Sequence, residues 1–118
     1  LVVLELGAND GLRGLPLAQI RDNLTAMIRA CQAAGALVVL LGIELPINYG
    51  PQYRDGLRAM YRDLAGEFNL PLVPFLLDGV ATDPNLMQDD GLHPRAEGEP
   101  KVLDNVWPVL EPAIAKLK

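Results

Sequence analysis

The only histidine among the 118 residues, His93, follows the carboxylate of Asp90 by three positions. Side chains three residues apart in a tight turn can face each other, so Asp90 can accept a hydrogen bond from one ring nitrogen of His93. Such a bond fixes the tautomer and raises the basicity of the other nitrogen, which can then take a proton from a nucleophile. An isolated Asp-x-x-His pattern more often only stabilises a loop and the helix after it.

A second candidate group, Asn9, directly follows an apolar run at residues 1–6 in the stretch GAND. A neutral side-chain amide has two N–H donors, and such a donor can stabilise an oxyanion that develops during acyl transfer. Asn and Asp are also common turn formers, and for Asn9 and Asp10 taken alone that interpretation is favoured. The combination of the two motifs therefore matters more than either one.

A nucleophile is harder to find, because the chain contains no serine. Cys31 lies on an apolar helical stripe, which favours a core thiol over a reactive one. Thr82, in a polar loop, and Asp10, as a carboxylate nucleophile, stay open as weaker candidates. Asp89, Asp90 and His93 form at most a weak metal-binding pattern, so we expect no metal and no other cofactor.

The apolar pattern predicts the elements that must position these groups. Short apolar runs at 1–6, 36–43 and 72–75 indicate buried strands, and periodic stretches at 16–35, 52–69 and 96–117 indicate helices. Buried strands that alternate with amphipathic helices predict an α/β fold, a parallel sheet with helices on both faces, in one domain spanning residues 1–118. We expect Tyr53, Tyr61, Phe68 and Trp107, which recur at helical spacing, to lie in the core.

The predicted topology also brings the two motifs together. In open parallel sheets, ligands bind outside the carboxyl ends of the strands. The loops at 7–15, 44–51 and 78–94 leave those ends, and the first and third hold Asn9 and the Asp90–His93 pair. A net charge of −5 argues against nucleic acid as a partner, and no apolar run is long enough for stable membrane insertion.

Taken together, the stretches GAND at 7–10 and DGLHP at 90–94 resemble the SGNH (GDSL) hydrolase superfamily. The resemblance is strongest to the bacterial arylesterase, thioesterase I and lysophospholipase L1 group. It extends over LELGANDGLRG at 4–14, NYG at 48–50 and MQDDG at 87–91, and so covers essentially the whole chain.

The resemblance implies a flavodoxin-like three-layer α/β/α fold and a serine esterase or thioesterase with a small acyl ester or thioester substrate. It implies that Asn9 donates to the oxyanion, that His93 is general base and then general acid, and that Asp90 orients His93. Residues near the substrate would be Gly7, Asp10, Gly11, Leu12, Asn48 and Tyr49, with Gly11 to Gly14 in a mobile loop. The group is commonly exported, which implies a periplasmic or secreted protein.

The chain departs from the family pattern in one large respect. The family's serine belongs to an N-terminal Gly-Asp-Ser block, and a glycine in a second block is a further oxyanion donor; neither block occurs here. We expect both to lie upstream of Leu1, with the first strand and helix of an N-terminally truncated domain, so that this chain alone is inactive. The alternative is an α/β binding or interaction domain that lacks the nucleophile.

Overall fold

The computed structural model describes residues 1–117 as three strands, four α-helices and two short 3₁₀ helices. In chain order these are β1 (Val2–Leu4), α1 (Ala8–Leu12), α2 (Leu17–Ala33), β2 (Val38–Leu41), η1 (Ile47–Tyr49), α3 (Pro51–Glu67), β3 (Leu72–Val73), η2 (Ala96–Gly98) and α4 (Glu99–Ala115). The sheet has the order β1-β2-β3, and both pairings are parallel. The predicted α/β fold with a parallel sheet is confirmed.

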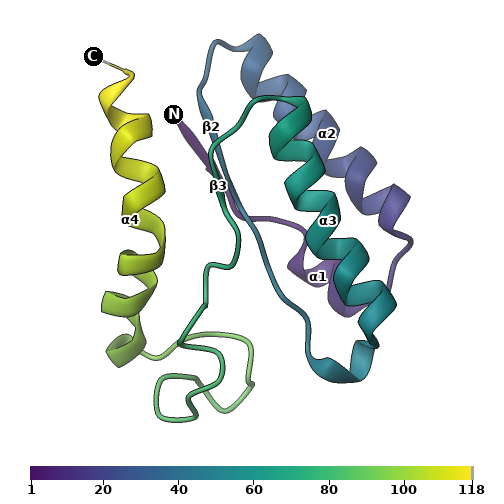
Figure 1. The fold of residues 1–118 in the computed structure, drawn as a ribbon, viewed down its shortest axis with the longest axis vertical. Helices are drawn as coiled ribbons and strands as arrows, with labels where there is room; N and C mark the ends of the chain where they lie inside the picture. Colours follow the sequence, from purple (N-terminus) through teal and green to yellow (C-terminus); the bar gives the residue numbers. More distant parts are fainter. Residues whose placement is uncertain (118) are drawn as a thin grey trace.

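The elements form three layers, with the sheet in the middle (Figure 1). Helices α2 and α3 lie side by side on one face, and α4 stands alone across the other face. At the carboxyl ends of the strands lie α1 and the long loop between β3 and η2. Parallel strands need crossover connections, and because the strands are added in one direction, crossovers of the same hand place α2 and α3 on one face. Helix α4 follows the last strand and covers the other face.

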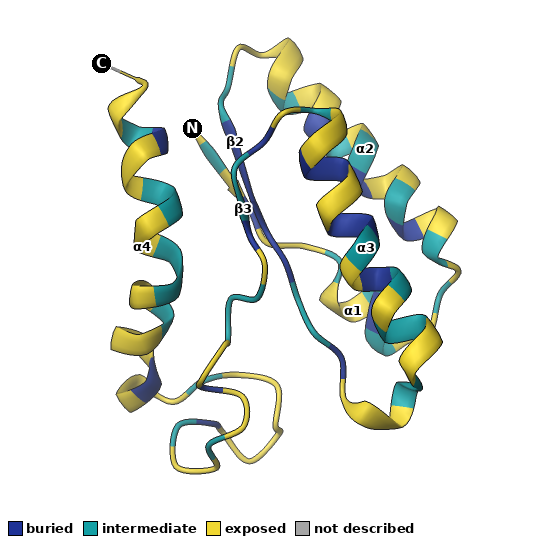
Figure 2. Cartoon of the chain, in the orientation of Figure 1, coloured by how far each residue is buried: buried dark blue, intermediate teal, exposed yellow. Residues whose placement is uncertain are grey.

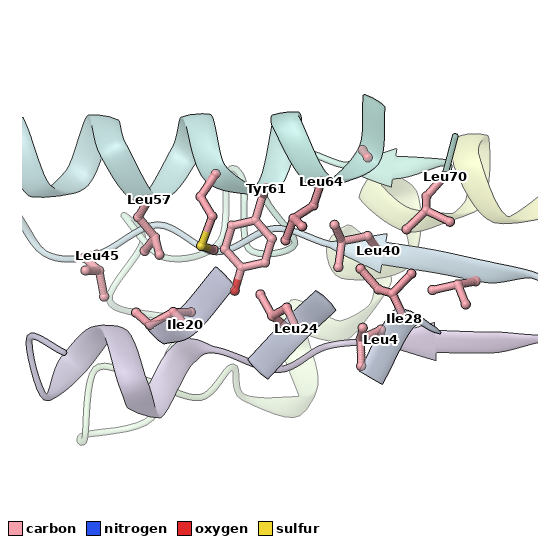
Figure 3. Packing of buried hydrophobic residues seen from close by; sticks show 13 residues of the cluster. Leu4, Ile20, Leu24, Ile28, Leu40, Leu45, Leu57, Tyr61, Leu64 and Leu70 are labelled. Carbon is pink, nitrogen blue, oxygen red and sulfur yellow. The ribbon is translucent and has the colours of Figure 1, made fainter. Parts of the chain in front are cut away.

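Most of the core lies between the sheet and the α2/α3 pair. Side chains alternate along β2, so Val38 and Leu40 point to this face while Val39 and Leu41 point to the other. Tyr61 of α3 is 2% exposed, and its ring packs among the aliphatic side chains of this layer (Figure 3). The expectation that Tyr61 lies in the core is confirmed.

The α4 face is covered more thinly (Figure 2). Its buried cluster consists of Val39, Leu41, Val73 and Ala113. The Val3 side chain of β1 and Trp107 of α4 are each 43% exposed. The expectation that Trp107 lies in the core is wrong, because α4 meets the sheet through Val109, Leu110 and Ala113 instead. Helical spacing predicts an apolar stripe, but it does not say what covers each position.

Two boundaries differ from the sequence-based prediction in ways that affect the site. Residues 7–15, expected to be a loop, contain the five-residue helix α1. Strand β3 ends at Val73 rather than at residue 75, and the next bond to the Gly42 carbonyl comes from the Leu76 N–H instead of the Phe75 N–H. Within residues 1–117, no helix is long and apolar enough to cross a membrane.

Candidate active site

The segment that carries Asn9, residues 7–15, follows β1 and is called here the Asn9 segment. It begins at Gly7, whose φ of +109° is unfavourable for any residue with a Cβ. A Cβ on Gly7 would also collide with the Tyr61 hydroxyl. Because of this backbone turn the chain enters α1 directly after β1, and Asn9 stands exposed near the carboxyl end of the sheet.

The loop that carries His93, residues 86–95, is called here the His93 turn. Asp90 Oδ1 accepts hydrogen bonds from the backbone N–H groups of Leu92 (2.9 Å) and His93 (3.1 Å). Asp90 Oδ2 lies 2.7 Å from Nδ1 of the His93 ring. Gly91, at a φ of +69°, allows the chain to reverse between the two. The expected contact of Asp90 with the imidazole is present.

These bonds also decide the charge and the tautomer. The hydrogen bond from His93, with those from the backbone amides of Leu92 and His93, lowers the pKa of Asp90 from 3.8 to about 2. At neutral pH the carboxylate is ionised and has no proton to donate, so Nδ1 of His93 must be the donor. In the neutral ring, Nε2 then carries the free lone pair, which is the arrangement a general base needs.

Further bonds within the His93 turn hold its two arms together. The Gln88 N–H donates to the His93 carbonyl at 2.8 Å, and Met87 and Pro94 form an antiparallel bridge. Arg95 donates from its backbone N–H to the Leu86 carbonyl at 2.7 Å and from Nε to the Met87 carbonyl at 2.6 Å. The imidazole is therefore oriented by bonds that are local in sequence.

Asn9 and His93 line one cleft of about 470 Å³. Its apolar lining includes Leu12, Ile43, Leu45, Pro46, Phe75 and Leu76, and its polar lining includes Glu5, Glu44, Arg54 and Thr82. A base and an amide donor thus face the same space, beside apolar surface that an acyl chain could contact. Together with a nucleophile, such a pair of groups can support acyl transfer.

The six residues expected near the substrate are placed differently from one another. Leu12 lines the cleft. Gly11 is buried, with room for a Cβ limited by Leu45 and Leu57, and Asp10 is half-buried. Asn48 is exposed on η1. Gly7, the first residue of the Asn9 segment, lies against Tyr61, and Tyr49 contacts the segment by donating from its hydroxyl to the Leu12 carbonyl.

Two charged residues of the cleft were not anticipated from the sequence. Glu44 follows β2 and pairs with Arg58, whose Nε and Nη2 approach its two carboxylate oxygens at 2.9 and 3.0 Å. Arg54 donates from Nε to the Leu45 carbonyl at 2.9 Å. The position of Glu44 after a predicted buried strand was the signal that could have identified it.

Two of the alternative nucleophiles considered from the sequence lie in different parts of the molecule. Thr82 lines the cleft, whereas Cys31 is half-buried on α2 against the α2/α3 core. Among residues 1–117, no group of three or more His, Cys, Asp or Glu side chains is arranged to hold a metal ion.

Comparison with known proteins identifies the family to which the chain belongs. The model of the GDSL-like lipase/acylhydrolase family matches residues 1–99, and the chain therefore belongs to this family. It is 48% identical over 114 residues to the esterase TesA of Pseudomonas aeruginosa, covering 97% of this chain and 57% of that protein.

Two further comparisons agree. The thioesterase 1/protease 1/lysophospholipase L1 of Escherichia coli K12 is 41% identical over 113 residues, covering 96% of this chain and 54% of that protein. A crystal structure of TesA superimposes with a TM-score of 0.90 at 49% identity, covering 95% of this chain and 62% of that one. The chain spans about half the length of the curated relatives it matches.

Proposed function

We propose that this chain forms the base-bearing part of a serine hydrolase that cleaves carboxylic esters or thioesters. The observation that carries the proposal is the shared cleft of His93 and Asn9, with the imidazole hydrogen-bonded to an ionised Asp90. The names of the relatives include an esterase and a thioesterase, and they support carboxylic esters or thioesters as the bonds that are cleaved.

The proposed reaction assigns a step to each group. A serine hydroxyl attacks the acyl carbon, and its proton passes to Nε2 of His93. The oxyanion that forms accepts a hydrogen bond from the side-chain amide of Asn9. The imidazolium then protonates the leaving oxygen or sulfur, and water repeats the sequence to release the acid. Asp90 stays ionised throughout and holds the ring.

The serine, in this proposal, lies on a segment outside the 118 residues, which contain none. The surface beside β1 suits such a segment. β1 is an edge strand, Val3 is exposed on the α4 face, and Trp107 is exposed on α4. A strand added parallel to β1, followed by a helix beside α4, would cover these apolar groups and end at the same edge of the sheet as Asn9.

The test compares this chain with the longer polypeptide read from the upstream coding sequence. We expect a Gly-Asp-Ser block there, labelling of the longer form by a fluorophosphonate, and hydrolysis of short-chain p-nitrophenyl esters. This chain alone should neither label nor turn over. His93→Ala and Asn9→Ala should slow the longer form strongly, and unchanged rates would remove both residues from the mechanism.

The absence of a serine favours one second candidate, an acyl-binding domain without hydrolytic activity. In that case the upstream sequence would lack the serine block, and the chain would bind a fatty acid in the cleft without labelling. Labelling of this chain alone would contradict both candidates and would point to Thr82, which a Thr82→Ala variant would test.

A further inference from the structure

The chain has three tyrosines, and every one of their hydroxyls donates to a backbone carbonyl in or next to the Asn9 segment. The Tyr61 hydroxyl donates to Leu6 at 2.8 Å, directly before Gly7. The Tyr49 hydroxyl donates to Leu12 at 2.5 Å, and the Tyr53 hydroxyl donates to Leu15 at 2.5 Å. The donors come from η1 and α3, more than 35 positions further along the chain.

Inside the Asn9 segment the bonds are short-range backbone ones, such as those from the N–H of Gly11 to Gly7 (2.9 Å), of Arg13 to Asn9 (3.0 Å) and of Leu15 to Asp10 (3.2 Å). Helix α1 is five residues long, and isolated helices of that length are not stable in water. Its start has no side-chain cap. The carbonyls of Leu12 and Leu15 lie at and beyond its end, where no helical N–H follows in register, and Pro16 has no N–H to donate. The hydroxyls of Tyr49 and Tyr53 donate to these two carbonyls.

The third contact fixes the other end of the segment. Tyr61 is 2% exposed, and its ring is held in the α2/α3 core (Figure 3). Its hydroxyl lies where a Cβ on Gly7 would stand, so the same atom that binds the Leu6 carbonyl also limits the path of the backbone at Gly7. Asn9 is therefore bracketed by hydroxyl contacts before and after α1.

We propose that Tyr49, Tyr53 and Tyr61 are positioning residues for Asn9, and that their hydroxyls, rather than their rings alone, determine where its amide stands in the cleft. The hydroxyls bind only main-chain carbonyls and leave the Asn9 side chain free for the substrate. The catalytic meaning of this role rests on the proposed function, whereas the holding of the segment does not.

The first test measures hydrogen exchange by mass spectrometry on this chain, comparing Tyr49→Phe, Tyr53→Phe and Tyr61→Phe with the parent. A phenylalanine keeps the ring and removes the hydroxyl. Peptides from residues 7–15 should exchange about tenfold faster, while those from 86–95 stay unchanged. Because Tyr61→Phe alters a buried site and can weaken the whole fold, the half-buried Tyr49 and Tyr53 give the decisive variants.

A matched control removes similar bonds elsewhere. Asn105 donates from Nδ2 to the carbonyls of Leu76 (3.0 Å) and Asp78 (2.7 Å), so Asn105→Ala should leave exchange of residues 7–15 unchanged. Unchanged exchange of that segment in both Tyr49→Phe and Tyr53→Phe would overturn the proposal.

The second test is a double-mutant cycle in the longer, serine-containing polypeptide. Tyr49→Phe should lower kcat about tenfold with KM changed less than about twofold, and this effect should fall below about twofold in an Asn9→Ala background. An equal effect in both backgrounds would overturn the positioning role. If Asn9→Ala alone leaves kcat unchanged, the proposed function fails at Asn9, and the exchange experiment still decides whether the hydroxyls hold the segment.

Discussion

The two parts of the site, the Asn9 segment and the His93 turn, are held in place by different kinds of contact. In the His93 turn, Asp90 binds groups two and three residues away, and Arg95 closes the turn onto Met87 eight residues back. The Asn9 segment depends on hydroxyls from residues 37 to 55 positions away. The proposed base is thus positioned locally, and the proposed oxyanion donor is positioned by tertiary structure.

This difference predicts how each part responds to change. A substitution in the His93 turn should alter chemistry while leaving the fold nearly intact, because the turn is exposed and bonded to itself. A substitution at the start of the Asn9 segment, next to Leu6 and Gly7, should alter stability, because that end of the segment is joined to the α2/α3 core through Tyr61.

The largest effect is expected from Asp90→Asn in the proposed longer polypeptide that contains the serine. The backbone N–H groups of Leu92 and His93 hold the amide oxygen at the Oδ1 position, so the amide NH2 faces Nδ1 of His93 and donates to it. Nε2 then carries the proton and not the free lone pair, and kcat should fall about 10³–10⁴-fold. The thermal midpoint should hardly move. Asp89→Asn, at the adjacent carboxylate that meets only Arg95, is the control and should keep its rate. A loss of stability large enough to explain the lost activity would contradict local positioning.

Gly7→Ala should lower stability more than any change in the His93 turn. The new Cβ would meet the Tyr61 hydroxyl and would stand at a φ of +109°, so we expect the free energy of unfolding to fall by about 3 kcal/mol in urea titrations. Gly66→Ala, on the exposed side of α3 with no heavy atom within 4 Å of the new Cβ, should instead stabilise slightly. Equal effects at the two glycines would refute the dependence on Tyr61.

Gly91→Ala should cost less, about 1 kcal/mol, because the strain is limited to a φ of +69° with open space around the new Cβ. The change should appear as faster hydrogen exchange within residues 86–95 and not in residues 7–15. Gly91→Asn should recover part of the loss, since Asn tolerates this backbone region. Faster hydrogen exchange in α1 of the Gly91→Ala variant would show that the Asn9 segment and the His93 turn are coupled.

The smallest effect concerns pH. The pKa of Asp90 is depressed to about 2, so its interaction with His93 stabilises the folded chain fully above the ordinary value of 3.8 and is lost as pH falls through about 2. A carboxyl NMR titration should place the midpoint near 2, and His93→Ala should move it back toward 3.8. A midpoint near 3.8 in the unmodified chain would mean that the contact does not persist in solution.

The same difference explains how far the sequence could predict the structure. Asp90 and His93 lie three residues apart, so their contact follows from the geometry of a turn. Buried strands and periodic helices predicted the parallel sheet, and the sheet topology predicted a common edge for both motifs. Residues 7–15, with three Gly beside Asn9 and Asp10, gave no helical pattern. Helix α1 is short and is held by hydroxyl donors from distant positions in addition to its own backbone bonds, and neither is visible in local propensity.

The aromatic residues show most clearly what sequence periodicity could not predict. Helical spacing predicted that Tyr61 and Trp107 are both core residues, and only Tyr61 is buried. Periodicity reports which residues share a face and not which faces meet a neighbour. It also treated Tyr53 and Tyr61 as apolar rings, whereas the structure uses their hydroxyls as donors to the Asn9 segment.

The self-contained bonding of the His93 turn has a consequence for comparing sequences. Because these hydrogen bonds join residues of the turn to one another, the turn needs neither a nucleophile nor the sheet to keep its shape. An intact Asp-x-x-His stretch in a distant homologue is therefore evidence of an inherited bend in the chain. Whether that homologue still hydrolyses anything has to be read from other positions.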